Sequence, residues 1–160
     1  MTRAHGDAHQ LRSTVVRIFN VVGPRQAPQA AVVPLFLDQA MRCESITVNG
    51  DGRQSRCFTD VRDVVAALVR LAECDEACGE IVNIGTRREH SISDLAHMVK
   101  STTRSDSNIV SVPYGLDVGQ SRTPSISKAR QLIGFAPVHR FEDTVNEMIA
   151  LAGEAPPTAS

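Results

Sequence analysis

The sequence predicts an α/β fold, in which helices pack against a largely parallel sheet. Two runs, Val15–Val22 and Glu80–Ile84, are rich in β-branched apolar residues, and each is followed by a glycine. Runs of this kind are typical of strands that are covered on both faces, as in a parallel sheet. Elsewhere the apolar residues recur at helical spacing. Strand and helix patterns that alternate in this way favour an α/β architecture.

The next elements follow the first strand in order. Ala31–Arg42 has a helical pattern, in which Pro34 is tolerated because it falls in the first turn. Ile46–Val48 and Cys57–Val61 are predicted to be short strands, and the Asn-Gly and Asp-Gly pairs between them indicate a hairpin. We expect Val15–Val22 and Glu80–Ile84 to pair as parallel neighbours, with this hairpin in a smaller lobe.

Helix signals dominate the rest of the chain. Val64–Ala72 carries an amphipathic stripe, and Asp63 is placed to cap that helix. Ser91 and Asp94 have the spacing of a capping box at the start of another helix. The remaining predicted elements are a short strand, a helix stopped by glycine and a last amphipathic helix, at Ile109–Pro113, Ser127–Ile133 and Phe141–Ala152.

Composition places the chain among ordinary globular proteins. Of its 160 residues 42% are hydrophobic, and the formal net charge of -1 provides no attraction for nucleic acid or an anionic membrane. No apolar run has the roughly 18–20 residues needed to span a bilayer, and the N-terminus lacks the apolar core of a signal peptide. We therefore expect a cytoplasmic protein with one folded region, 15–152, between a lead-in at 1–14 that is the remnant of a helix and a disordered tail at 153–160.

Metal binding and histidine chemistry are not indicated by the residue pattern. The four cysteines have no zinc-like spacing, so we expect reduced thiols and no metal site. The histidines are scattered, and each is expected at the surface: His5, His9, His90, His97 and His139.

The segment Gly50–Phe58 is the first candidate for ligand binding. Two glycines allow a close approach of the backbone, and Arg53 and Arg56 follow them. Guanidinium groups bind diphosphate oxygens through paired hydrogen bonds and keep their charge. Spacing alone favours the plainer interpretation, an exposed hairpin whose arginines are merely solvated, and a diphosphate site stays open as the alternative.

An ordered set of motifs resembles the nucleotide-sugar epimerases and dehydratases, the extended short-chain dehydrogenase/reductase family. The set comprises R-I-F-N-V-V-G-P at Arg17–Pro24, V-P at Val33–Pro34, V-N-G-D-G-R-Q-S-R-C-F-T-D-V-R-D at Val48–Asp63, N-I-G at Asn83–Gly85 and I-G-F-A-P at Ile133–Pro137. The resemblance runs from about Val15 to Ala150 and is closest to the UDP-glucose 4-epimerase and UDP-glucuronate decarboxylase branch. It implies a partial Rossmann-like fold, with C-terminal strands and a small substrate-binding lobe.

The resemblance also implies site residues. Those matching substrate-binding positions are Asn20, Val33, Asn49, Arg56 and Arg122, and Val21 matches a position against the nicotinamide of the cofactor. Arg56 and Arg122 are expected to hold the diphosphate from opposite sides.

Three positions depart from the family pattern. Asn49 stands where a tyrosine is usual, so stacking on the base is lost there. Asp60 replaces an aromatic residue or histidine, and Ser125 replaces an aspartate. The run before Arg122 is also shorter than usual, which affects substrate specificity.

The family's catalytic and cofactor signatures are not found in the sequence. There is no G-x-G-x-x-G turn for NAD, and Tyr114 is followed four residues later by Val118 instead of the lysine of a Tyr-x-x-x-Lys pair. The N-terminal βαβ cofactor unit is therefore expected to be missing, and the chain to be inactive alone. It is then a truncated product or half of a split enzyme, with a UDP-sugar as ligand and NAD as the family cofactor.

Two alternatives remain open for the function. One is a non-catalytic sugar-nucleotide-binding module, and the other is a remnant without activity. Because the first strand would present an unpaired edge, we expect self-association or a second chain that supplies the N-terminal half.

Overall fold

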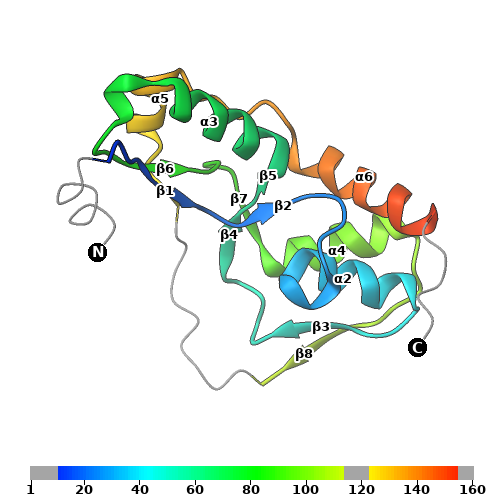
Figure 1. The fold of residues 1–160 in the computed structure, drawn as a ribbon. Coiled ribbons are helices and arrows are strands. Elements are labelled where there is room, and N and C mark those ends of the chain that lie inside the picture. The colour runs from blue at the N-terminus through cyan, green and yellow to red at the C-terminus, as the bar shows by residue number, and fades with distance from the viewer. Residues whose placement is uncertain (1–10, 114–122, 155–160) are drawn as a thin grey trace.

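The computed structural model describes residues 11–113 and 123–154. The elements are, in order, β1 (Val15–Ile18), β2 (Val21–Val22), η1 (Pro28–Ala30), α2 (Val32–Met41), β3 (Ile46–Asn49), β4 (Ser55–Cys57), β5 (Thr59–Asp60), α3 (Val61–Glu73), η2 (Asp75–Ala77), β6 (Ile81–Ile84), β7 (Glu89–Ser91), α4 (Ile92–Thr103), β8 (Ile109–Val112), α5 (Ser127–Ile133) and α6 (Phe141–Glu154). Figure 1 shows them in two groups, with β1, β6, α3 and α5 in one and α2, α4, α6, β3 and β8 in the other. The predicted α/β class is confirmed.

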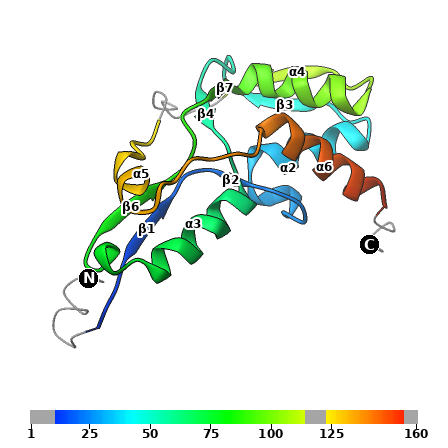
Figure 2. The same ribbon diagram turned by 90° about the horizontal axis from the view of Figure 1, so that it is seen from above.

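The predicted parallel neighbours do pair. β1 and β6 run parallel, with Val15 opposite Ile81 and Ile18 opposite Ile84. Helices α3 and α5 both lie on the same side of this pair in Figure 1, and Figure 2 shows the same elements from above. They form a second core with β6, made by Val64, Ala67, Leu71, Ala77, Val82, Ile84, Ile126, Ala129 and Phe135.

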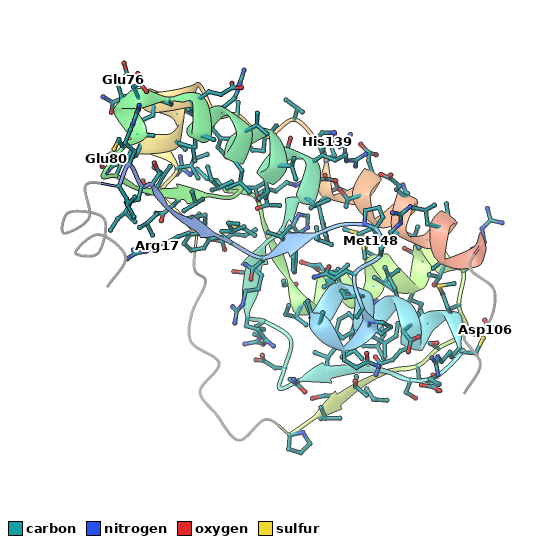
Figure 3. All side chains as sticks on the ribbon, viewed as in Figure 1. Arg17, Glu76, Glu80, Asp106, His139 and Met148 are labelled. Atoms are coloured by element: carbon teal, nitrogen blue, oxygen red, sulfur yellow. The ribbon has the colours of Figure 1, made fainter. Side chains whose placement is uncertain are left out.

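The expected burial of this strand on both faces is wrong for β1. Arg17 and Ile18 are exposed, and Arg17 extends from the side of β1 away from α3 (Figure 3). An apolar β-branched run shows that both faces of a strand could be covered, but it does not show that both are. Among the described residues, only the face toward α3 and α5 is packed.

Val15–Val22 is also not one strand, because the chain bends at Asn20. The backbone of Asn20 has φ 39°, and its Nδ2 donates to the carbonyl of Cys57 at 3.0 Å. Asparagine tolerates this left-handed region better than most residues do. The bend starts a new strand, so that β2 pairs in parallel with β5 instead of continuing the pairing with β6.

The predicted hairpin across residues 46–61 is wrong. β3 pairs in parallel with β8, and β4 pairs antiparallel with β7, so the two segments do not pair with each other. Gly50 and Gly52 do have φ near +70°, as the glycine-rich turn required. The turn therefore redirects the chain between two different strand partners, which local turn chemistry alone does not distinguish.

A first core joins α2, β3, α4 and α6. Its largest fully buried side chains are Phe36, Ile46 and Leu95. Met148 lies where α6 faces α2 and α4 (Figure 3). This core fixes the start of α2 against β3, which is the geometry that shapes the pocket described below.

Two helix ends have the caps that the sequence predicted, and one has a different cap. Ser91 caps α4 by accepting from the N–H of Asp94, and Gly134 ends α5 with φ 61°, both as predicted. The N-cap of α3, however, is Asp60 and not Asp63. Asp63 lies in the first turn, where it is buried.

Asp63 ties the segment before α6 to α3. Its carboxylate accepts from the backbone N–H groups of Val138 and His139 at 3.2 Å and lies 2.8 Å from Nδ1 of His139. Figure 3 shows His139 beside α3, at the approach to α6. A residue that the sequence suggested as a helix cap therefore connects the two groups of elements.

Most of the predicted lead-in and tail lies outside the described residues, so those two assignments stay predictions. Residues 11–14 enter β1 without helical structure, and the carbonyl of Ser13 accepts from Gly79 at 2.7 Å. Helix α6 extends to Glu154, two residues beyond its predicted end.

Candidate functional site

A pocket of about 340 Å³ lies between β2, the first turns of α2, β3 and β4. Its volume is within the range of small-molecule sites. The wall is mainly apolar, with amide side chains and one arginine placed around it. The lining residues are Asn20, Val21, Val22, Gln26, Ala31, Val32, Val33, Leu35, Phe36, Thr47, Asn49, Gln54, Arg56, Phe58 and Ile92.

Five of the six site residues named from the sequence line this one pocket. Asn20 and Val21 come from the bend between β1 and β2, Val33 from the first turn of α2, Asn49 from the end of β3 and Arg56 from β4. They span 37 positions of the chain, and only the pairing of β2 with β5 and the packing of α2 on β3 bring them together. The sixth, Arg122, lies outside the described residues, as does Tyr114.

Arg56 is the cationic group of the pocket. It is half-buried, its Nη1 donates to the carbonyl of Ser55 at 2.7 Å, and it forms no ion pair in the described part of the chain. Arg53 differs, since its side chain is 89% exposed and lies 3.5 Å from a carboxylate oxygen of Asp51. Arg56 thus lines the pocket without an ion-pair partner among the described residues, whereas Arg53 is exposed beside Asp51.

The backbone N–H and C=O groups of Thr47 and Asn49 point toward the edge of β3 that does not pair with β8. The N–H of Ile46 donates to the Asn108 carbonyl at 2.8 Å, and that of Gly50 donates to the end of β8 at 2.9 Å. Backbone groups alternate in direction along a strand that pairs in parallel. The N–H and C=O groups of Thr47 and Asn49 therefore point to the other edge.

Two glutamines occupy part of this edge. The N–H of Thr47 donates to Oε1 of Gln39 at 3.1 Å, and the carbonyl of Asn49 accepts from Nε2 of Gln54 at 2.9 Å. The carbonyl of Thr47 and the N–H of Asn49, which lie between them, have no hydrogen-bond partner in the part of the chain that the structure describes. This strand edge offers a neighbouring acceptor and donor at the pocket.

Gln26 adds a further polar group that sequence reasoning missed. Its Nε2 donates to the carbonyl of Val21 at 3.4 Å. Its Oε1 is buried without a partner, the only such side-chain nitrogen or oxygen among the described residues. No local pattern marks Gln26, because its place in the wall follows from the loop path after β2. Gln54, by contrast, stood within the recognised glycine-rich motif.

An aromatic cluster packs behind the pocket wall at Phe58, which is the member of the cluster that lines the pocket. Phe58 stacks on Phe141 with ring centroids 4.7 Å apart, and His90 lies 4.8 Å from Phe141. Burial lowers the pKa of His90, and the charge of Arg88 lowers it further, against opposing effects of Glu142 and Asp94. The expectation that His90 lies at the surface is wrong, because β7 turns this residue inward beside Phe58.

Asp60 fills the position where the family pattern has an aromatic residue or histidine. Its side chain is fully buried, accepts from Arg62 at 2.7 Å and receives a hydrogen bond from Oγ1 of Thr144 at 2.6 Å. Burial acts to raise the pKa of Asp60, but these hydrogen bonds, the N–H of Arg62 and its charge outweigh it and lower that pKa to about 2. Asp60 is therefore an ionised structural link between α3 and α6.

The described residues do not supply a pyrophosphate cradle for a dinucleotide. Such a cradle needs a helix N-terminus with unoccupied N–H groups behind a glycine turn. The N-termini of α3 and α4 are capped by the side chains of Asp60 and Ser91. The residues directly before α2, α5 and α6 are Ala31, Ile126 and Arg140, so none of these helices follows a glycine turn. Val21 is the only residue here that matches a cofactor position, so no chemical step is assigned to NAD on this chain.

Other binding classes find little support in the described ranges 11–113 and 123–154. No group of three or more histidine, cysteine or carboxylate side chains there is able to hold a metal ion. None of the helices in these ranges has the length and apolar character to cross a bilayer. The four cysteines are free thiols.

Sequence relatives point to enzymes that act on UDP-sugars. The sequence profile of the NAD dependent epimerase/dehydratase family matches residues 1–85. A UDP-N-acetyl-alpha-D-glucosaminuronate decarboxylase of Bacillus cytotoxicus is 37% identical over 144 residues, which cover 85% of this chain and 44% of that protein. UDP-glucuronic acid decarboxylase 1 of Danio rerio is 39% identical over 136 residues, which cover 84% of this chain and 32% of the relative.

Solved structures of the same kind share the fold. An epimerase from Methanothermobacter thermautotrophicus superposes with a TM-score of 0.91 at 28% identity, over 96% of this chain and 46% of its own. The UDP-glucose 4-epimerase of Thermotoga maritima, solved with UDP-glucose, gives 0.88 at 28% identity, over 96% and 51%. The chain thus spans about half the length of these structures and less than half of the curated relatives. With its fold and its ordered motifs, the chain belongs to the NAD-dependent epimerase/dehydratase family.

Proposed function

We propose that this chain forms the nucleotide-sugar-binding part of an NAD-dependent epimerase/dehydratase and binds a UDP-sugar in the pocket. The observation that carries the proposal is the convergence of Asn20, Val21, Val33, Asn49 and Arg56, from separate elements, on one wall. The profile match and the relatives support the ligand class, since their names refer to UDP-sugars.

The chemistry of the wall suggests an orientation for the ligand. The β3 edge at Thr47 and Asn49 suits the base, because a base edge carries donors and acceptors side by side. Arg56 suits the diphosphate, since charge-assisted bonds from a guanidinium to phosphate oxygens are strong. Asn20, which lines the pocket from the bend before β2, is then the polar group left for the sugar. Asn49 carries no ring, so the base is held there by hydrogen bonds and by the apolar start of α2.

Calorimetric titration with UDP and UDP-glucose tests this proposal. We expect saturable binding of one ligand per chain, and we expect Arg56→Ala to weaken it about tenfold to a hundredfold. Arg53→Ala is the matched control, because Arg53 is exposed and does not line the pocket. A chain that stays folded but binds neither ligand would favour the alternative of a remnant without binding function.

The second diphosphate arginine remains a prediction. If Arg122 acts from the opposite side, its guanidinium should lie within roughly 10 Å of that of Arg56, because a diphosphate carries its charges on adjacent oxygens. Arg122→Ala should then weaken UDP binding as much as Arg56→Ala does, and a crystal structure with UDP would show both groups. An Arg122 turned away from the bound diphosphate would contradict the assignment.

Turnover requires groups that the described site does not contain. The family name implies NAD, and the described residues lack its pyrophosphate cradle, so we propose that this chain alone does not epimerise or decarboxylate a UDP-sugar. β1 pairs only with β6 among the described strands, and its other edge is suited to a strand from a chain or segment carrying the NAD-binding half. Turnover by the repurified chain with added NAD would refute this part.

A further inference from the structure

We propose that the outer face of α3 and the free edge of β1 form a homodimer interface, through which two copies of this chain associate about a two-fold axis. This α3–β1 surface consists of Val16, Ile18, Val65, Leu68, Val69 and Ala72. The inference goes beyond the proposed nucleotide-sugar function, because none of these residues lines the pocket.

Helix α3 carries an apolar stripe on its solvent side, and Figure 2 shows this helix on the outside of the fold beside β1. Val65, Leu68 and Val69 share one helix face and are 53%, 38% and 53% exposed. Ala72 continues the stripe by one turn. The opposite flank is polar, and there Nη1 of Arg70 donates to a carbonyl at the end of α5 at 3.2 Å. The stripe therefore lies on the flank of α3 that faces away from α5.

The stripe is continuous with β1. Leu68 and Ala72 line, together with Val16, a second cavity of about 440 Å³ between α3 and the start of the chain's first strand. Val16 packs against the core under α3, and because side chains alternate along a strand, Ile18 lies on the same side, where it is 44% exposed. Five of the eight exposed large apolar side chains among the described residues come from α3 and the segment 11–18.

Strand β1 adds an unpaired row of backbone groups to this surface. The N–H of Val15 donates to the carbonyl of Glu80 at 2.9 Å, on the side of β6. Backbone groups alternate in direction along the strand, so those of Val16 and Ile18 point away from β6. No other described strand pairs with this edge, and a free edge is a template for a further strand.

A second copy fits the strand edge and the helix stripe at the same time. A two-fold axis beside β1 pairs this strand antiparallel with itself and brings the two α3 stripes together. Each α3 packs over its own β1–β6 pair. Since neighbouring strands are about 4.8 Å apart, the two α3 helices would lie about 10 Å apart across the axis, which is the distance at which helices pack.

Charge selects a register for this pairing. A register centred on Val16 places Arg17 opposite Val15 of the second copy. A register centred on Arg17 would place two guanidinium groups opposite each other, which is destabilising. The terminal segments 1–10 and 155–160 do not match the surface, since Met1 is their only large apolar residue. Because the NAD-binding half is proposed for the same strand edge, its association and the homodimer exclude each other.

Sedimentation of the purified chain at increasing concentration tests the inference. We expect a species of twice the mass of the chain, whose share rises with concentration. Leu68→Asp should weaken the dimer at least about a hundredfold, because two leucine contacts are lost and two carboxylates enter apolar surroundings. Ile18→Lys should weaken it about tenfold, since a lysine on a strand edge opposes pairing. Val65→Asp repeats the test at a more exposed position of the stripe.

Leu151→Asp is the matched control, because Leu151 is 40% exposed on α6, outside the surface, against 38% for Leu68. Hydrogen exchange locates the contact: the amides of Val16 and Ile18 should exchange more slowly at high protein concentration, and Leu68→Asp should abolish this difference. UDP binding should be unchanged in Leu68→Asp, so a failure of the proposed function is seen separately.

A chain that stays monomeric at about 100 µM would overturn the inference and leave the surface to the NAD-binding half. A dimer that Leu68→Asp and Val65→Asp do not weaken, or that Leu151→Asp weakens as much as they do, would also overturn it, because the contact would then lie elsewhere.

Discussion

The replacement Asp60→Asn offers a direct measure of what holds α3 against α6. Asparagine still caps a helix, so the change removes the charge while retaining most of the cap. In the folded chain the carboxylate is fully buried, bonded to Arg62 and Thr144, and has its pKa lowered from 3.8 to about 2. At about 1.4 kcal/mol per pKa unit, this lowering corresponds to about 2.5 kcal/mol of unfolding free energy. For a chain of this size we expect a melting temperature lower by about 5–10 °C.

The pH dependence of the unfolding free energy follows from the direction of the Asp60 pKa shift. A carboxylate whose pKa is lower in the folded state contributes its full stabilisation above the unfolded value and loses it as pH falls toward the folded value. Urea unfolding of both proteins from pH 7 to pH 2 should therefore give a constant difference down to about pH 5, which then shrinks.

The matched control for Asp60 is Asp38→Asn, because Asp38 forms an i,i+4 ion pair with Arg42 at the helix surface. Such pairs contribute about 0.3–0.5 kcal/mol, so the control should unfold almost as the unmodified chain does. A loss below about 1 kcal/mol at pH 7 for Asp60→Asn, or a loss that does not change down to pH 2, would contradict the reasoning.

Three further predictions concern the pocket and the packing beneath it. Arg56→Ala should weaken UDP binding about tenfold to a hundredfold and Arg53→Ala less than about threefold, as measured by calorimetry; the reverse order would defeat the assignment of the diphosphate site. The pKa of His90 is lowered in the folded chain, so as pH falls below 6.5 the imidazole is protonated in the unfolded chain before it is protonated in the folded one. The free energy of unfolding should therefore decrease between pH 7 and pH 5. In urea unfolding, His90→Leu should abolish this dependence on pH. Asp63→Ala should release the backbone at His139, which hydrogen exchange would detect as faster exchange of that amide, with no effect on UDP binding.

Much of the local structure could be predicted from the sequence because its causes lie within a few residues. The cap at Ser91, the end of α5 at Gly134 and the tolerated Pro34 in the first turn of α2 each depend on neighbours in the chain. The parallel pairing of β1 with β6 was also predictable, because both runs have the apolar composition of inner strands.

The predictions of the α3 cap, of the hairpin and of an exposed His90 were wrong for a common reason. Asp60 and Asp63 are equally plausible caps within one turn, and only contacts with α6 and the segment before it separate their roles. Residues 46–61 carry a hairpin signal, but β3 and β4 pair with β8 and β7, which lie more than 30 residues further along the chain. Such partners are chosen by packing over long sequence separations.

For the candidate site, too, local features were predictable from the sequence and long-range contacts were not. The sequence by itself determined which residue types were present for a nucleotide sugar, namely an arginine after a glycine turn and an asparagine at the end of a strand. Only the tertiary structure decided that Asn20, Val33, Asn49 and Arg56 share one wall, and that Gln26 and Gln39 belong to the same neighbourhood. Side-chain type is a property of each position, whereas a pocket exists only where the packing of α2 on β3 and the pairing of β2 with β5 bring distant positions together.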